Sequence, residues 1–219
     1  EKYQRYVLKK AIDLKKDQTY FIHRLSQEQL SQAMLPIGRF NKPEIKELAR
    51  KVGITIDDLE ESQDFYSGDY KDLLDVKDHP GNIVDSNGHI LGHHQGTWNY
   101  TIGQRKGLGI AWSEPLYVIS LNAEDNTVVV GTRDETFRSS FIVSDMNRVA
   151  LSGLSQPVDC TSKIRSAQKE REARIEPMDD GRVRVTFFQP NDAITPGQSA
   201  VFYDGDVVLG GGIIEEVGG

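Results

Sequence analysis

TPGQSAVFYDGDVVLGGGII, residues 195–214, decides the fold of the C-terminal part of the chain. β-Branched and aromatic residues on both sides of Asp204-Gly205 predict two antiparallel strands joined by a tight turn. The segment TPGQ, just before the first strand, predicts a type II turn with Pro196 at its second position and Gly197 at its third. The stretch therefore predicts a turn followed by a closing hairpin.

Three other segments have the same pattern of apolar runs around a polar turn. They are NIVDSNGHIL around Asn87-Gly88, LYVISLNAEDNTVVVGT across a polar loop, and ARIEPMDDGRVRVTFF around Asp180-Gly181. So many short antiparallel strands are typical of barrels and sandwiches. NRVALSGLSQPVD, residues 147–159, is poor in charge and contains Gly and Pro, so we expect it to join two β units.

The first 75 residues have helical patterns instead. Ser26 with Gln29 three positions later predicts a capping box at the start of one helix. Asn41 is a candidate N-cap of a second helix, and Gly53 is its expected C-terminal stop. Between them, apolar residues recur at helical spacing at Ile45, Leu48, Ala49 and Val52.

Length and composition indicate a globular protein of one to three domains. The chain has 219 residues, of which 37% are hydrophobic and 27% charged, and one cysteine. No apolar run reaches the roughly 20 residues that a membrane span needs, and the N-terminus lacks a signal peptide. We expect a cut end at Glu1, and a reducing, cytoplasmic location because a single cysteine permits no intrachain disulfide.

The formal net charge of -7 argues against a nucleic-acid binder only if the charge were evenly spread. Residues 1–24 carry seven Lys and Arg against three acidic residues, whereas residues 57–78 carry nine acidic residues against two Lys. One acidic segment therefore matches the whole net charge, and the rest of the chain can still present a basic face.

Two basic stretches are candidate nucleic-acid contacts. WNYTIGQRKGLGI, residues 98–110, places glycines around Gln104, Arg105 and Lys106, which suits close approach to phosphate. Its spacing matches no standard nucleotide-binding loop, so a basic β-turn is the alternative. KIRSAQKEREAR, residues 163–174, is either a solvated loop or edge strand, or a phosphate-contacting edge.

Other reactive residues give weaker signals. His89, His93 and His94 lie in a strand-like region in which 94 faces away from 89 and 93, so we expect no metal site there. Cys160 has no nearby His to activate it and is expected to be a small buried residue. The carboxylates of ESQDFYSGDY, residues 61–70, form either an acid/base pair or a solvated acidic hinge.

Four stretches together resemble the tRNA-specific 2-thiouridylases, which replace the 2-oxygen of the wobble uridine with sulfur. They are KKDQTYFIHRLSQEQL, LPIGRFNKPEIKELARKVGI, NYTIGQRKGLGI and TPGQSAVFYDGDVVLGGGII, in the order and spacing of that family. The family has an ATP pyrophosphatase domain with an SGG-x-DS loop, a central β domain and a C-terminal β-barrel. No SGG-x-DS occurs in this chain.

The resemblance implies a mainly β fold with an N-terminal helical segment. Residues 1–75 would be the helical tail of the α/β ATP pyrophosphatase domain, residues 76–136 the central β domain, and residues 137–219 an antiparallel β-barrel. The binding of ATP with Mg²⁺ would lie upstream of Glu1, where an iron-sulfur cluster is also an option. The implied partners are the tRNA anticodon stem-loop and a sulfur-donor protein, with no membrane.

The resemblance also implies site residues. Lys16, Asp17 and Gln18 match a tripeptide that contacts tRNA in the family. Arg165 matches the arginine of an Arg-Tyr pair, although Ser166 stands where the tyrosine would be. Gln198 matches a glutamine that contacts tRNA, and the family context places the loop of Gln104, Arg105 and Lys106 near the tRNA or the active site.

Residues 61–70 then correspond to a catalytic loop that lacks its nucleophile. Many relatives have a persulfide-carrying cysteine shortly after the position of Ser62, where this chain has Phe65 and Tyr66. Two hypotheses follow. The intact protein thiolates tRNA with sulfur from elsewhere, or it is a tRNA- or protein-binding module without thiolation activity.

Overall fold

The computed structural model describes residues 3–54 and 78–218, which fall into two compact units. One unit comprises Glu1–Val52 and Phe137–Gly219, and the other comprises Gly53–Thr136. The stretch of residues 61–70, with Phe65 and Tyr66, lies outside the described residues, as does most of the acidic segment 57–78.

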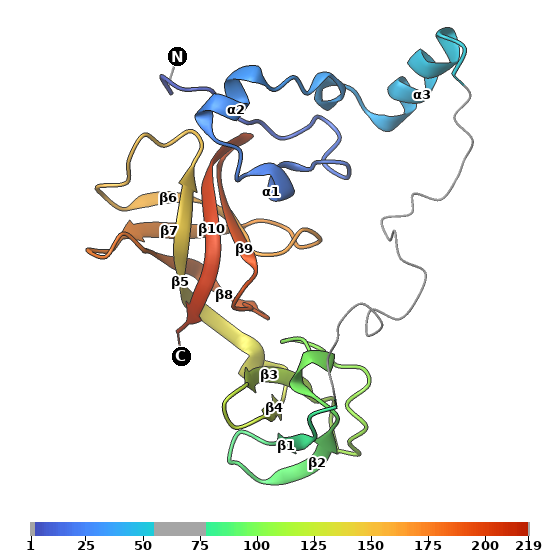
Figure 1. Cartoon of the computed structure of the whole chain (residues 1–219), viewed down its shortest axis with the longest axis vertical. Coiled ribbons are helices and arrows are strands. Elements are labelled where there is room, and N and C mark those ends of the chain that lie inside the picture. Colours follow the sequence, from blue (N-terminus) through green and yellow to red (C-terminus); the bar gives the residue numbers. More distant parts are fainter. Residues whose placement is uncertain (1–2, 55–77, 219) are drawn as a thin grey trace. The chain divides into compact units, whose positions relative to one another are not determined.

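A closed six-stranded barrel dominates the first unit (Figure 1), with the strand order β10-β5-β8-β7-β6-β9. All neighbouring strands in it are antiparallel. The expected mainly β fold with a C-terminal antiparallel barrel is therefore confirmed. The strands are β5 (Phe137–Arg148), β6 (Val158–Lys163), β7 (Arg171–Pro177), β8 (Val183–Asp192), β9 (Ser199–Asp204) and β10 (Val207–Val217).

The hairpins predicted in this half are present. Asp204 pairs with Val207 across a two-residue turn, in which Gly205 has a φ of 60°. Strands β7 and β8 are likewise joined through Asp180-Gly181, with Gly181 at a φ of 83°. Glycine suits both turns because it has no Cβ to clash in the left-handed region.

Residues 147–159 do not join two β units, contrary to the expectation from their composition. They connect β5 to β6 within the barrel, where Val149 and Ala150 are buried. The amides of both residues donate to the carbonyl of Leu209, at 3.0 and 3.1 Å. These two residues are the only buried ones of the segment, and residues 152, 153 and 155–157 are exposed.

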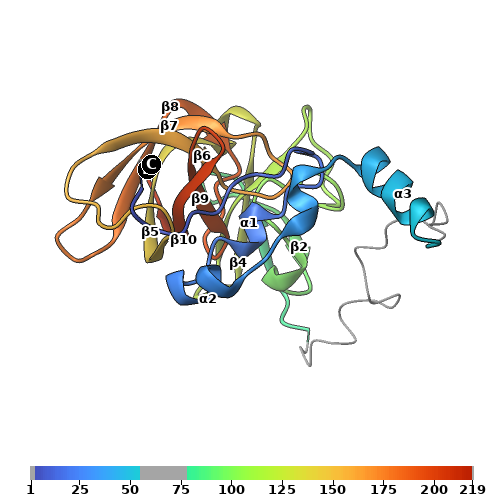
Figure 2. The same ribbon diagram turned by 90° about the horizontal axis from the view of Figure 1, so that it is seen from above.

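Strand β9 is buried on both faces. Ala200 and Phe202 point into the barrel core, whereas Val201 and Tyr203 belong to a second apolar cluster on its outer surface. That cluster is covered by the N-terminal segment, and Figures 1 and 2 show α1 (Thr19–Ile22) and α2 (Gln27–Gln32) on this side of the barrel. The segment contributes Leu8, Tyr20 and Leu30.

The helix caps follow the sequence prediction. Ser26 and Gln29 form the capping box of α2. Asn41 caps α3 (Lys42–Lys51) and forms a second box with Glu44. A short 3-10 helix, η1 (Pro36–Arg39), lies between α2 and α3. Within the described part of the chain, no helix has the length and apolar character that a membrane crossing requires.

The apolar residues of α3 are not buried. Leu48 is 44% exposed, the C-cap residue Val52 is 72% exposed, and no described residue of this helix is buried. Figures 1 and 2 show α3 projecting away from the barrel. Its caps and helical spacing are local signals, so they predict the helix without determining what packs against it.

The second unit contains a four-stranded sheet with the order β2-β1-β4-β3. β1 (Gly81–Val84) and β2 (Ile90–His94) form the predicted hairpin around Asn87-Gly88, and β3 (Tyr117–Asn122) and β4 (Thr127–Gly131) form the other. Strands β1 and β4 are parallel. The described part of this unit also contains the 3-10 turns η3 (Thr97–Asn99) and η4 (Asp134–Thr136).

Candidate functional site

The tripeptide Lys16, Asp17 and Gln18 lies immediately before α1. The Asp17 carboxylate accepts hydrogen bonds from the Ala11 amide, at 2.9 Å, and from the Thr19 hydroxyl, at 2.5 Å. Lys16 and Gln18 are exposed. Asp17 therefore shapes the turn, while its two neighbours present side chains to solvent.

Arg165 lies in the loop between β6 and β7, and its guanidinium reaches the segment TPGQ. Arg165 Nη2 donates to Thr195 Oγ1 at 2.7 Å. The predicted turn is present, since the Gln198 amide donates to the Thr195 carbonyl at 3.2 Å and Gly197 has a φ of 83°. Gln198, at the end of the turn, is exposed. The structure thus brings Arg165 and the turn of Gln198 together.

Tyr20, two residues after Gln18 on α1, bonds to the backbone beside the other two expected contacts. Its hydroxyl donates to the carbonyls of Ser199, at 2.9 Å, and Ile164, at 3.2 Å. Ser199 directly follows Gln198, and Ile164 directly precedes Arg165. The ring is buried, and this burial raises the pKa of the Tyr20 hydroxyl, so the hydroxyl keeps its proton.

A second polar group fixes the N-terminal segment to the barrel. The ammonium of Lys10 pairs with the Glu170 carboxylate at 2.6 Å and lies 4.4 Å from the centroid of the Tyr203 ring. The side chains of Lys10 and Glu170 are only 13% and 25% exposed, and Glu170 also accepts from the Thr161 hydroxyl at 2.7 Å. The hydroxyls of Tyr203 and Thr19 are 3.3 Å apart.

Sequence reasoning did not identify Tyr20, Lys10 or Glu170 as parts of this site. Each contributes through contacts with residues more than a hundred positions away in the chain. Local pattern carries no information on such contacts. The only available signal was that Tyr20 and Lys10 lie in the basic N-terminal segment.

The second unit carries the loop of Gln104, Arg105 and Lys106. The Gln104 side chain donates to the Lys106 carbonyl at 2.9 Å and accepts from the Thr101 amide at 3.0 Å, so it stabilises the loop from inside. Arg105 and Lys106 are exposed. Three glycines of this loop have positive φ values, 84° at Gly103, 79° at Gly107 and 68° at Gly109. Residues that carry a Cβ rarely adopt such angles.

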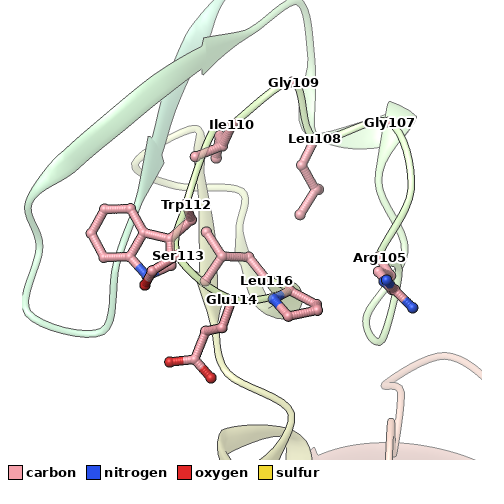
Figure 3. Close-up of a pocket in the computed structure, with 10 residues that line it drawn as sticks. Arg105, Gly107, Leu108, Gly109, Ile110, Trp112, Ser113, Glu114 and Leu116 are labelled. Atoms are coloured by element: carbon pink, nitrogen blue, oxygen red, sulfur yellow. The ribbon is translucent and has the colours of Figure 1, made fainter.

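This loop borders an open hollow of about 490 Å³ within the second unit. Figure 3 shows Arg105 and Trp112 at opposite sides of it. Trp112 is 50% exposed, and Leu108, Ile110 and Leu116 contribute apolar lining. The hollow belongs to the second unit alone.

The three histidines have separate partners. His89 bonds to the Asp85 carboxylate at 2.9 Å, His93 to the Asn82 side chain at 3.0 Å, and His94 to the Asn126 carbonyl at 3.1 Å. Among residues 3–54 and 78–218, no three His, Cys, Asp or Glu side chains gather in a way that could hold a metal ion. Each of these three histidines thus bonds to a residue of its own sheet or of a turn beside it.

Cys160, on β6, packs against the barrel core. Burial, with Asp159 and Asp204 adding to it, raises the pKa of the thiol to about 12. The thiolate is the nucleophilic form, so the residue is a poor nucleophile at neutral pH. An iron-sulfur cluster does not fit this chain either, because such clusters are held by several cysteines and the chain has one.

Alkylation tests the state of Cys160 directly, because it is the only cysteine. We expect the rate of reaction with iodoacetamide to keep rising beyond pH 10 in the folded chain, because the thiol pKa is about 12. In denaturant the rate should level off above the ordinary thiol pKa of about 8.5. A plateau below pH 9 in the folded chain would contradict a buried, unactivated thiol.

Three family models match consecutive parts of the chain. Residues 1–66 match the tRNA methyl transferase HUP domain, residues 71–132 the tRNA methyl transferase PRC-barrel domain, and residues 138–214 the aminomethyltransferase beta-barrel domain. Together these matches extend over nearly the whole chain.

The similar proteins are named tRNA-specific 2-thiouridylases. The chain is 47% identical to MnmA 1 of Caldanaerobacter subterraneus subsp. tengcongensis, over 97% of this chain and 60% of that protein. It is 46% identical to MnmA of Endomicrobium trichonymphae, over 95% and 59% of the two chains. It is 43% identical to MnmA of Acetivibrio thermocellus, over 97% and 61%. The chain thus spans about 60% of the length of these relatives.

Proposed function

Since the chain belongs to the family of the tRNA-specific 2-thiouridylases, we propose that the intact protein uses ATP to install sulfur at C2 of the wobble uridine of tRNA. This portion would bind the anticodon stem-loop and position it. The observation that supports the proposal is that α1, which directly follows Lys16–Gln18, bonds through the Tyr20 hydroxyl to the backbone next to Arg165 and next to Gln198.

The chemistry of this surface suits RNA. Lys16 and Arg165 supply positive charge for phosphates, and a guanidinium can donate two parallel hydrogen bonds to one phosphate. The exposed amides of Gln18 and Gln198 can donate and accept, as contacts with a base edge or a ribose require. Ser166 cannot stack as the family's tyrosine would, so the guanidinium is the proposed contact at this position.

The chemical steps belong to other parts of the protein. ATP with Mg²⁺ would activate the uridine oxygen at residues outside this chain, which has no SGG-x-DS loop. Cys160 is no substitute for a persulfide cysteine, because its thiol is partly buried against the barrel core and its pKa is raised to about 12. We therefore propose that the sulfur comes from residues beyond this chain, with or without an iron-sulfur cluster there, and from a sulfur-donor protein.

The remaining assignments are part of the same proposal. Arg105 and Lys106 would contact tRNA from the second unit, with Gln104 holding their loop in shape. Residues 1–75 would complete the catalytic domain, with 76–136 as the central domain and 137–219 as the barrel. The protein would work in the cytoplasm, where tRNA is modified.

Salt dependence tests the tRNA surface. We expect the chain to bind tRNA with an affinity that falls steeply as salt rises, because phosphate contacts release counterions. Arg165→Ala should lower the slope of log K against log salt by about 0.7 to 0.9, which corresponds to one phosphate contact. Arg184→Ala is the control, since this exposed arginine lies on β8, two strands from β6. Equal slopes for both variants and the unmodified chain would count against the assigned surface.

The absence of cysteine from residues 61–70 favours one alternative, a tRNA- or protein-binding protein without thiolation activity. The two functions differ in the tRNA that they leave behind. The intact gene, expressed in cells that lack their own 2-thiouridylase, should restore 2-thiouridine, seen as retarded tRNA in mercury-containing gels. Unretarded tRNA despite binding would support the alternative.

A further inference from the structure

Lys163 lies two residues before Arg165, and the resemblance to the 2-thiouridylases assigns it no role. It is the last residue of β6 and is opposite Val201 of β9. Val201 belongs to the outer cluster that the N-terminal segment covers, so the Lys163 side chain lies on the same outer side. Its ammonium is 5.9 Å from the centroid of the Tyr20 ring.

No carboxylate of residues 3–54 or 78–218 pairs with Lys163. The acids of this surface have other partners. Glu170 pairs with Lys10, and Asp17 accepts hydrogen bonds from the Ala11 amide and the Thr19 hydroxyl. A partly exposed ammonium without an acidic partner is suited to an anionic ligand.

Tyr20 fixes the backbone beside Lys163. Its hydroxyl bonds to the carbonyl of Ile164, the single residue between Lys163 and Arg165. The same hydroxyl bonds to Ser199, next to Gln198. The ring therefore lies under the Lys163 ammonium, while its hydroxyl sets the relative positions of the two loops. Tyr20 thus contacts the Lys163 ammonium through its ring, and the backbone next to Arg165 and Gln198 through its hydroxyl.

We propose that Lys163 binds an RNA phosphate beside Arg165, and that Tyr20 is the positioning residue for this phosphate subsite. The proposal rests on the proposed function of tRNA binding. It adds a cation and a positioning tyrosine to the expected contacts, and it names the phosphodiester backbone as the group that Lys163 recognises. Phosphate contacts of this kind set register and orientation rather than sequence preference.

Binding of unmodified tRNA across a salt series tests the role of Lys163. We expect Lys163→Ala to lower the slope by about 0.7 to 0.9 and to weaken binding several-fold at low salt, because one phosphate contact is lost. Lys163→Arg keeps the charge and should restore both values. Arg184→Ala is again the matched control, and thermal unfolding of each variant checks that it is folded.

Tyr20→Phe separates positioning from charge. It keeps the ring beneath the ammonium and removes only the hydroxyl that joins the two loops. We expect weaker tRNA binding, on the order of tenfold, with an unchanged salt slope, because the cations remain but are no longer held in register. Unchanged affinity would overturn the positioning role of Tyr20.

The outcomes distinguish this inference from the proposed function. A reduced slope in Arg165→Ala with an unchanged slope in Lys163→Ala would overturn the phosphate subsite and leave tRNA binding intact. Absence of any tRNA binding by the unmodified chain at low salt would overturn the proposed function and the subsite together. Reduced slopes in both variants, restored by Lys163→Arg, would support the subsite.

Discussion

Gly81→Ala is expected to destabilise the second unit by about 3 kcal/mol or more while the barrel stays folded. A Cβ on Gly81 would overlap the backbone carbonyl of Asn126 and lie 2.8 Å from the His94 ring. Neither neighbour can easily move away. The Asn126 carbonyl bonds to His94 at 3.1 Å, and the Asn126 side chain donates to the carbonyls of His79 and Pro80 at 3.0 and 2.8 Å.

The clash of the added Cβ is expected to outweigh the stabilisation that a glycine-to-alanine change usually gives in a strand. Replacing glycine with alanine inside a strand ordinarily favours folding by roughly 0.5 to 1 kcal/mol, because the unfolded chain loses freedom. At Gly81 the clash with a fixed carbonyl exceeds this gain. Gly92→Ala, on the neighbouring strand β2, is the matched control, since its Cβ would meet only Ile110 at an ordinary 3.7 Å.

The chain provides separate probes for its two units. Both of its tryptophans, Trp98 and Trp112, lie in the second unit, so tryptophan fluorescence follows the unfolding of that unit. Its only cysteine, Cys160, lies in the barrel, so thiol labelling in denaturant follows the barrel. Gly81→Ala should lower the denaturant midpoint followed by tryptophan fluorescence and leave the midpoint followed by thiol labelling unchanged. Equal fluorescence midpoints for Gly81→Ala and Gly92→Ala would show that the Asn126 turn adapts to the added methyl group.

Local signals predicted most elements of the fold. The turns at Asn87-Gly88, Asp180-Gly181 and Asp204-Gly205 join strands as expected, because glycine determines where a hairpin can reverse. The caps at Ser26 and Asn41 likewise depend on residues only three positions apart. These features are encoded within a few residues, so a single sequence is sufficient to find them.

Pairings between distant segments could not be predicted from local pattern. The parallel pairing of β1 with β4 and the pairing of β6 with β9 depend on how whole hairpins pack. The same holds for residues 147–159, which connect β5 to β6 within the barrel instead of joining two β units. An apolar pattern shows that a segment is buried but not which partner buries it.

In the candidate site, too, the contacts between distant segments could not be predicted from the sequence. The resemblance supplied Lys16–Gln18, Arg165 and Gln198, and whether they contact tRNA stays a prediction. The structure adds the groups between them, Tyr20 and Thr195, which hold the three segments together. The residues around a tyrosine do not indicate that its hydroxyl bonds to two distant backbone carbonyls.

Gly211→Val is expected to destabilise the barrel unit by about 3 kcal/mol or more and to weaken tRNA binding at least tenfold. Gly211 lies on β10 where the strand passes beneath α1. A Cβ there would be 2.6 Å from the Ala200 carbonyl oxygen and 2.6 Å from Cδ2 of His23. His23 is buried, its Nδ1 bonds to the Tyr20 carbonyl at 2.8 Å, and Asn147 donates to its carbonyl at 2.7 Å. The added side chain must therefore displace the end of α1, and with it Tyr20.

Gly211→Ala should have a smaller effect in the same direction, because it adds the clashing Cβ without the two further methyl groups. Gly153→Ala is the control in the same unit, since a Cβ there would meet nothing within 4 Å. Thiol labelling in denaturant measures the loss of stability, and tRNA binding under conditions in which the variant is folded measures the displacement of Tyr20. If Gly211→Ala matched Gly153→Ala in stability and in tRNA affinity, α1 would tolerate displacement and the tRNA surface would not depend on how closely α1 packs against β10. A joint loss would show that this packing controls both the stability of the barrel unit and the geometry of its RNA contacts.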